Sequence, residues 1–255
     1  MLRFVVPLVV VLLAGCDYAT GLFAQTIKLG EINEYKQFPA FLEPYRKGME
    51  LAAMEVNAAG GVLGKKIEIV SRDDNGVPGD AVRAAEELLT REKVALLMGT
   101  FASNVGLAVA DLAKRRQVLF IAAEPLTDKL VWENGNKYTF RLRASTYMQT
   151  AMLVPDAVKV GKKRWAIVYP NYEYGQAATN TFKEQMKARQ GADLEFIEQA
   201  VPLGKIEPGA VVQALADARP DAIFSSLFGP DLARFVREGE LRGLFKDRPV
   251  FNLLG

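Results

Sequence analysis

The stretch that decides the fold is Asn57-Ala-Ala-Gly60-Gly61-Val-Leu-Gly64-Lys-Lys-Ile67, which places the end of a helix directly before a strand. Asparagine and glycine tolerate the left-handed backbone that closes a helix, so a helix is expected to end within residues 57–61. The alternation of Ile67 and Ile69 with polar residues predicts a strand over Lys65–Ser71. A helix followed closely by a strand is typical of an α/β protein.

The glycines of this stretch also suggest a phosphate-binding loop. That motif requires a glycine where Ala59 stands, and a serine or threonine for magnesium where Lys66 stands. It also runs from a strand into a helix, whereas this segment runs from a helix into a strand. The phosphate-loop interpretation therefore fails.

Upstream, Thr26–Ile32 is predicted to be a strand, and the next helix is expected to begin near Pro44, since proline suits the first turn. Apolar residues recur along this helix at helical spacing and predict one buried face. They are Tyr45, Met49, Ala52, Ala53 and Val56.

Downstream, strands and helices continue to alternate, which predicts parallel pairing with right-handed crossovers. Before residue 144 the predicted elements are a helix capped by Asp80 and running to about Arg91, a strand at Val94–Met98, a helix capped by Ser103, and strands at Val118–Ala122 and Thr139–Arg143. After residue 146 they are strands at Arg164–Tyr169, Leu194–Ala200, Asp221–Leu227 and Arg248–Leu254, with helices at Gln176–Arg189, Pro208–Ala218 and Pro230–Leu241.

The fold class predicted from this pattern is α/β, with two Rossmann-like parallel-sheet domains at residues 25–144 and 145–255. No low-complexity linker separates them, so a short hinge is expected near residues 143–146. Ligands bind at the carboxyl ends of strands in open parallel sheets. Two such sheets facing each other predict a ligand cleft that closes by a hinge motion.

Residues 1–24 are predicted to be a secretory signal, because Arg3 precedes an apolar run at Val5–Leu13 that is short for a membrane span. Leu13-Ala14-Gly15-Cys16 resembles the bacterial lipobox, in which the cysteine is acylated, and this favours a lipid anchor on Cys16. Cleavage after Ala24 is the alternative and would release a soluble protein. Both interpretations of the signal, lipid anchoring and cleavage, predict an exported protein of the periplasm or cell envelope.

Composition excludes several kinds of chemistry. The chain has 255 residues and no histidine, so catalysis by serine–histidine or cysteine–histidine pairs and imidazole metal sites are ruled out. The single cysteine, Cys16, cannot build a thiolate metal site. A net charge of +2 gives no reason to expect nucleic acid as a partner. No catalytic residue, metal site or cofactor is therefore predicted.

From about Ile27 onward the chain resembles the Leu/Ile/Val-binding branch of the periplasmic solute-binding proteins. Besides the opening stretch, the matching segments are Asp73-Asp74, Gly99-Thr100-Phe101-Ala102-Ser103 and Tyr172-Glu173-Tyr174-Gly175. The resemblance implies a type I binding protein of an ABC importer that delivers its ligand to a permease in the inner membrane. That ligand would be a branched-chain or hydrophobic amino acid, or a small carboxylate, aromatic ones included.

Family members continue beyond the position of Gly255, so the resemblance also implies that the second domain lacks its final elements here. The acidic residue that commonly receives the ligand's amino group would lie near the end of this chain. Together with the phenylalanines at positions 41 and 228, where the family has tyrosines, this keeps an aromatic or other hydrophobic carboxylate without an amino group among the expected ligands.

Ser103 is the leading candidate for ligand binding, because it lies where a strand ends and a helix begins. Amides and the helix dipole favour an anion there, although a plain helix cap is the alternative. The resemblance implies that this serine binds the ligand carboxylate, and that the neighbouring Ala102 and Asn104 also belong to the ligand-binding site. It also implies that Tyr174 reaches the ligand from the second domain, the alternative being a half-buried tyrosine with its hydroxyl in water.

Further candidates follow from the same resemblance. Glu124 either receives an ammonium group or lies at the solvent rim, Leu126 offers backbone groups, and Thr127 offers a hydroxyl. Phe41 and Phe228 stand where the family has tyrosines, which would make the pocket more apolar, unless both serve only core packing. Arg141 and Arg143 share one face of a strand; a structural role near the hinge is favoured over attraction of an anion.

Three functions compete at this point. The resemblance favours a transport receptor, and a sensory receptor of the same fold is the second. A small α/β enzyme is the third, but it would need an activated nucleophile or acid–base pair, and no motif for either stands out.

Overall fold

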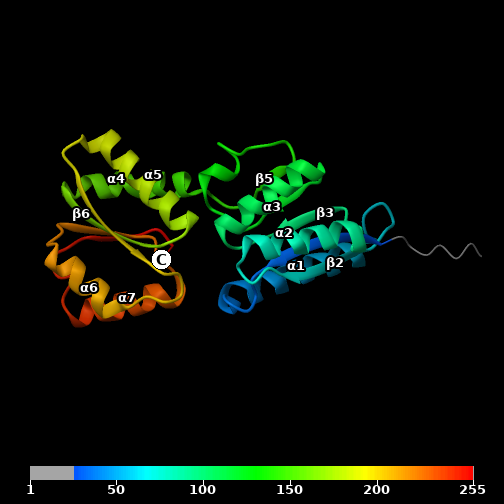
Figure 1. Cartoon of the computed structure of the whole chain (residues 1–255), viewed down its shortest axis with the longest axis horizontal. Coiled ribbons are helices and arrows are strands. Elements are labelled where there is room, and N and C mark those ends of the chain that lie inside the picture. Colours follow the sequence, from blue (N-terminus) through cyan, green and yellow to red (C-terminus); the bar gives the residue numbers. More distant parts are fainter. Residues whose placement is uncertain (1–25, 255) are drawn as a thin grey trace, which may run out of the picture.

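The computed structural model describes residues 26–254, so the predicted signal and the lipidation predicted at Cys16 lie outside the described residues. The chain forms one five-stranded sheet in the order β2-β1-β3-β4-β5 and one four-stranded sheet in the order β7-β6-β8-β9. All seven pairings in these sheets are parallel. Figure 1 shows the sheets in two units along the long axis, each with helices on its sheet; we call them the first and second lobes.

The first lobe contains β1 (Ile27–Asn33), α1 (Pro39–Ala58), β2 (Ile67–Asp73), α2 (Pro78–Glu87), a π-helical turn (Leu88–Glu92), β3 (Leu96–Gly99), α3 (Ser103–Arg116), β4 (Phe120–Ala122), a 3-10 turn (Asp128–Leu130) and β5 (Thr139–Arg141). The second lobe contains α4 (Thr146–Lys159), β6 (Arg164–Pro170), α5 (Glu173–Gln190), β7 (Glu195–Val201), α6 (Pro208–Asp217), β8 (Ala222–Ser225), α7 (Gly229–Leu241) and β9 (Val250–Asn252). The predicted α/β class with parallel sheets is therefore confirmed.

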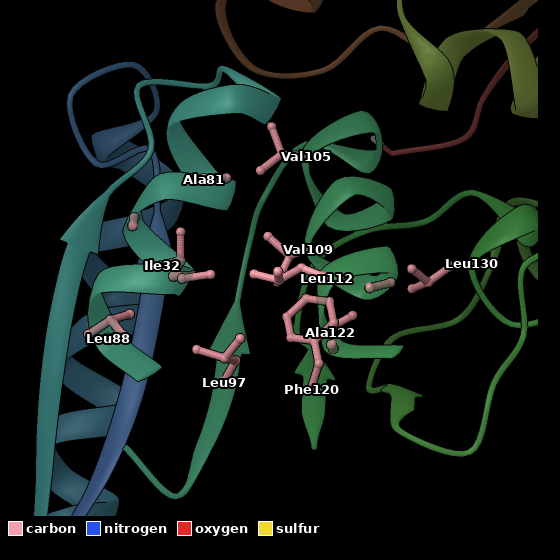
Figure 2. Packing of buried hydrophobic residues seen from close by; sticks show 14 of the residues in the cluster. Ile32, Ala81, Leu88, Leu97, Val105, Val109, Leu112, Phe120, Ala122 and Leu130 are labelled. Atoms are coloured by element: carbon pink, nitrogen blue, oxygen red, sulfur yellow. The ribbon is translucent and has the colours of Figure 1, made fainter. Parts of the chain in front are cut away.

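Apolar side chains of the central strands form the core of each lobe. In the first lobe, Ile32, Leu97 and Phe120 project from β1, β3 and β4 against α2 and α3, as Figure 2 shows. In the second lobe, Phe182 of α5 lies parallel to Phe224 of β8 with ring centroids 4.0 Å apart. Burial of such side chains supplies the main free energy that holds each sheet to its helices.

The helix α1 differs from the prediction in its start and in its burial. It begins at Pro39, which occupies the first turn, and Pro44 lies inside it. The predicted face is only partly buried: Leu42 is the one fully buried residue of this helix, and four of the five predicted residues, Tyr45, Met49, Ala53 and Val56, are half-buried. Leu51 and Met54 are 54% and 68% exposed. The helix packs beside the edge strand β2, so only a small part of its surface is covered.

Both predicted side-chain caps are also wrong. The helix α2 begins at Pro78 and α3 at Ser103, and the residues before them, Val77 and Ala102, cap without a side-chain bond. Asp80 lies within the first turn and bonds the Asn75 side chain instead. Proline fits the first helical position without a cap, which explains the shift at α2.

The helix α4 was not predicted, although its N-terminus joins the two lobes. Ser145 caps it by accepting a hydrogen bond from the Met148 amide at 3.3 Å. Asp128 of the first lobe accepts bonds from the Thr146 hydroxyl at 2.5 Å and the Tyr147 amide at 2.9 Å. The chain is thus anchored where it passes from one sheet to the other.

Within residues 26–254, no helix combines the length and the apolar character that crossing a bilayer requires.

Candidate ligand pocket

A pocket of about 260 Å³ lies between the lobes, at the carboxyl ends of their strands. The turn after β3 contributes Phe101 and the start of α3 contributes Ser103, whereas the turn after β6 contributes Tyr172 and the start of α5 contributes Tyr174. Its other lining residues are Phe41, Glu124, Leu126, Arg143, Phe228 and Leu254. Its size lies near the lower end of small-molecule sites, which span about 300–1,000 Å³.

Ser103 forms the polar floor of this pocket. Its Oγ accepts hydrogen bonds from the backbone amides of Leu126 at 3.1 Å and Thr127 at 3.3 Å. A hydroxyl has two acceptor lone pairs and one donor hydrogen, so both lone pairs are occupied and only the hydrogen remains to give. The side chain holds the 126–127 segment in place and can donate one bond to a ligand.

The turn that presents Ser103 has an unusual backbone. Gly99 has φ +105° and Thr100 has φ +59°, a conformation that β-branched residues rarely adopt. The first bond between backbone groups of α3 runs from the Gly106 amide to the Ala102 carbonyl. The amides before Gly106 therefore belong to the electropositive start of the helix, which favours an anion.

Aromatic rings form the walls of the pocket. Phe101 and Phe41 of the first lobe lie 6.0 Å from Phe228 of the second lobe, measured between ring centroids. Tyr174 lies 6.0 Å from Phe228 and 5.9 Å from Tyr172. These offset and edge-on contacts suit a flat or branched apolar ligand body.

The Tyr174 hydroxyl is a second donor within the pocket. Tyr174 is 2% exposed, and its Oη has no hydrogen-bond partner among the described residues. Burial raises the pKa of this phenol, so it keeps its proton at neutral pH. A buried polar atom without a partner calls for an explanation, and a bound ligand provides one.

Glu124 and Arg143 form an ion pair in the pocket wall. Glu124 follows β4 and Arg143 follows β5, so two neighbouring strand ends bring opposite charges together. The two charges offset each other, but only the Oε2 atom of Glu124 contacts Arg143, so the other carboxylate oxygen keeps its capacity to accept a hydrogen bond. Arg143 was expected to be structural, but it lines the pocket.

Six of the residues predicted from the sequence meet in this pocket: Ser103, Glu124, Leu126, Tyr174, Phe41 and Phe228. Ala102, Asn104 and Thr127 are not among its lining residues. Sequence reasoning missed Phe101, Tyr172 and Leu254 as lining residues, and it gave a place in the cleft for Arg143 only as the less favoured alternative. Phe101 and Tyr172 lie within the matched motifs, next to the residues that were chosen, so the signal for them was present.

Thr127 and Arg141 serve the framework around the pocket. The Thr127 hydroxyl donates to Glu173 of the second lobe at 2.7 Å, and Lys129 pairs with the same carboxylate at 3.2 Å. Arg141 donates to the carbonyls of Leu126 and Thr127, at 3.0 Å and 2.8 Å. These bonds tie the floor of the pocket to both lobes.

A cluster of buried carboxyl groups lies at the carboxyl ends of β1 and β2. Glu31, Glu34 and Asp74 are each at most 2% exposed. Loss of hydration raises the pKa of Glu34 to about 8, and those of Glu31 and Asp74 to about 6. A buried acid with a raised pKa is stable when protonated, so ionisation opposes folding.

This cluster predicts that the protein loses stability as pH rises from 3.8, the ordinary pKa of Asp74, to about 8, the raised pKa of Glu34. Each group can contribute a slope of up to about 1.4 kcal/mol per pH unit between its ordinary and its raised pKa. Above pH 6 only Glu34 still titrates, so Glu34→Gln should flatten the curve between pH 6 and 8. Thermal unfolding at intervals of half a pH unit measures this. A variant curve with the slope of the wild type would contradict the assignment to Glu34.

Two parallel α/β lobes that meet around a pocket with aromatic walls and two free donors define a two-lobed ligand-binding protein. The chain belongs to the periplasmic binding protein family, whose model matches residues 37–254. The resemblance found in the sequence is thereby confirmed. Family and fold are those of binding proteins rather than enzymes.

Similar proteins include Leu/Ile/Val-binding protein homolog 7 of Brucella suis, 27% identical over 92% of this chain. A solute-binding protein of an ABC transporter from Rhodopseudomonas palustris BisB5, solved with 3,4-dihydroxybenzoic acid, is 28% identical over 89% of this chain with a TM-score of 0.78. Another, from strain HaA2 with p-hydroxybenzoic acid, is 26% identical with a TM-score of 0.79. The chain spans 59% of the Brucella protein and 61% of each Rhodopseudomonas chain.

Proposed function

We propose that this protein captures a small aromatic carboxylate between its lobes and delivers it to an ABC permease in the inner membrane. The observation that carries the proposal is the pair of free donors, the Ser103 and Tyr174 hydroxyls, in a pocket walled by aromatic rings. A carboxylate accepts from both hydroxyls at the start of α3, while the ring of the ligand packs among Phe41, Phe101 and Phe228.

The Glu124–Arg143 pair favours an aromatic acid over an amino acid. An ammonium group is best received by an uncompensated carboxylate, and the charge of the one carboxylate that lines the pocket, Glu124, is offset by Arg143. The hydroxybenzoates named for the two Rhodopseudomonas proteins have a carboxylate and a ring but no amino group. Capture by binding alone requires no catalytic group, and we infer that the protein is not an enzyme.

The domain division and the location of the protein belong to the same proposal. Residues 25–144 and 145–255 would act as two domains that close over the ligand about residues 143–146. The family suggests an exported, periplasmic protein. In this scheme the protein is held at the membrane through an acylated Cys16, and release after cleavage behind Ala24 is the alternative.

The variant Glu124→Gln distinguishes the two ligand classes. For an aromatic acid we expect the dissociation constant to stay within threefold or to improve, because Arg143 is left free to attract the carboxylate. Titration calorimetry with 4-hydroxybenzoate and with leucine, on wild type and variant, measures this. Tight binding of leucine that falls more than tenfold in Glu124→Gln would overturn the aromatic assignment in favour of an amino acid.

A further inference from the structure

A second pocket, the side pocket, adjoins the ligand pocket and shares Phe228 with it. Its volume is about 310 Å³. Gln37 and Phe38 reach it from the first lobe, whereas Lys205, Asp231 and Arg234 reach it from the second. The side pocket therefore also lies where the lobes meet. The aromatic rings of Phe38 and Phe228 form a partition that separates it from the ligand pocket.

The partition between the two pockets consists of separate rings. Phe38 and Phe228 are tilted by 45° with centroids 5.9 Å apart, and Phe38 stacks on Phe101 at 4.8 Å. The two partition rings come from different lobes, so their spacing changes whenever the lobes open or close. Because Phe228 lines both pockets, a ligand ring packed against it lies next to the side pocket.

The charges of the side pocket favour an anion. Asp231 is 4% exposed, and its carboxylate accepts from the amides of Gly204 at 2.6 Å and Ile206 at 3.4 Å. It thereby fixes the segment that carries Lys205, and its own charge is already shared with these amides and with Arg234 at 3.9 Å. Lys205 makes no ion pair within residues 26–254, which leaves its charge and most of that of Arg234 available.

We propose that the side pocket is an anion subsite, in which Lys205 and Arg234 hold a second acidic group of the ligand. The inference rests on the proposed function, and it narrows the ligand from an aromatic monocarboxylate to an aromatic acid with a distal carboxylate or similar anion. Asp231 acts as a positioning residue for the 204–206 segment. Both cations are solvent-exposed, so their contribution is screened by salt.

The test compares aromatic dicarboxylates with their monomethyl esters, which remove the distal charge and add one methyl group at that end. The probes are terephthalate and the longer 4-carboxycinnamate, titrated by calorimetry at 20 mM and 300 mM salt. We expect at least one diacid to bind five- to tenfold more tightly than its ester at low salt, with a smaller ratio at high salt. The double variant Lys205→Gln/Arg234→Gln should lose that ratio and bind the ester as the wild type does.

The control variant is Arg237→Gln, which removes an exposed cation from the same helix, α7, outside the side pocket. It should keep the diacid preference. Diacids that bind no better than their esters, or a preference that survives in the double variant, would overturn the subsite while leaving the proposed function intact. Failure of all monocarboxylates, esters and diacids to bind would overturn the proposed function itself, and the subsite with it.

Discussion

Replacing Ser103 with alanine is expected to weaken binding of 4-hydroxybenzoate by about 10- to 100-fold. A hydrogen bond to a charged group is worth about 1.5–3 kcal/mol, and this variant removes one of the two donors assigned to the carboxylate. It also removes the acceptor that holds the amides of Leu126 and Thr127, so the floor of the pocket loosens. Titration calorimetry gives the dissociation constant directly.

The matched control for this variant is Ser225→Ala. Ser225 is 1% exposed, and its Oγ accepts a bond from the Leu227 amide at 3.1 Å, outside the pocket. Both alanine variants should lose about 1–3 kcal/mol of folding free energy, since Ser103→Ala leaves two amides and Ser225→Ala leaves one amide without the side-chain acceptor. Only Ser103→Ala should lose affinity. Equal affinities in the two variants would contradict the assigned bond from Ser103 to the ligand and would leave Ser103 with a structural role only.

Replacing Phe182 with alanine is expected to cost about 3–5 kcal/mol of folding free energy, the largest effect on stability that we predict. The ring is fully buried, parallel to Phe224, and edge-on to Trp165 with centroids 5.3 Å apart. Truncation leaves a cavity between α5 and the second sheet that the rigid neighbours cannot fill. Urea unfolding followed by tryptophan fluorescence measures the change, because Trp165 lies beside the cavity.

The control is Phe140→Ala, which makes the same truncation in β5 at a side chain that is 56% exposed. Its expected cost is within about 0.5 kcal/mol, as for most surface substitutions. A Phe182→Ala protein that unfolds at the same urea concentration as Phe140→Ala would show that α5 is held by contacts other than this aromatic stack.

The pattern of apolar residues predicted every strand of both sheets, because central strands such as β3 and β8 form short apolar runs and the edge strand β2 alternates apolar and polar residues. Element boundaries were less predictable. The start of α1 was placed at Pro44 because both prolines suit a first turn, and local chemistry does not choose between Pro39 and Pro44. The burial of α1 was overestimated for a different reason: spacing identifies an apolar face but not whether another element covers it.

The pocket was predicted in outline, because strand ends of parallel sheets meet and the matched motifs lie at those ends. The Glu124–Arg143 pair was not foreseen, since it joins two turns whose approach depends on the pairing of β4 with β5. The sequence predicted that the Thr127 hydroxyl contacts the ligand, but in the structure it donates a hydrogen bond to Glu173, which lies 46 residues further along the chain. Contacts of this kind depend on tertiary structure and leave no local pattern in the sequence.

The double occupancy of the Ser103 oxygen makes this position a chemical filter. Because both lone pairs are engaged by backbone amides, an amine or an amide N–H placed against Ser103 would find no acceptor there and would be buried unsatisfied. In such a site, the free energy lost when a wrong group is buried unsatisfied exceeds the free energy gained from the matching hydrogen bond. A compound with the same ring but an aminomethyl group in place of the carboxylate is thus excluded by its polarity, even where it fits by shape.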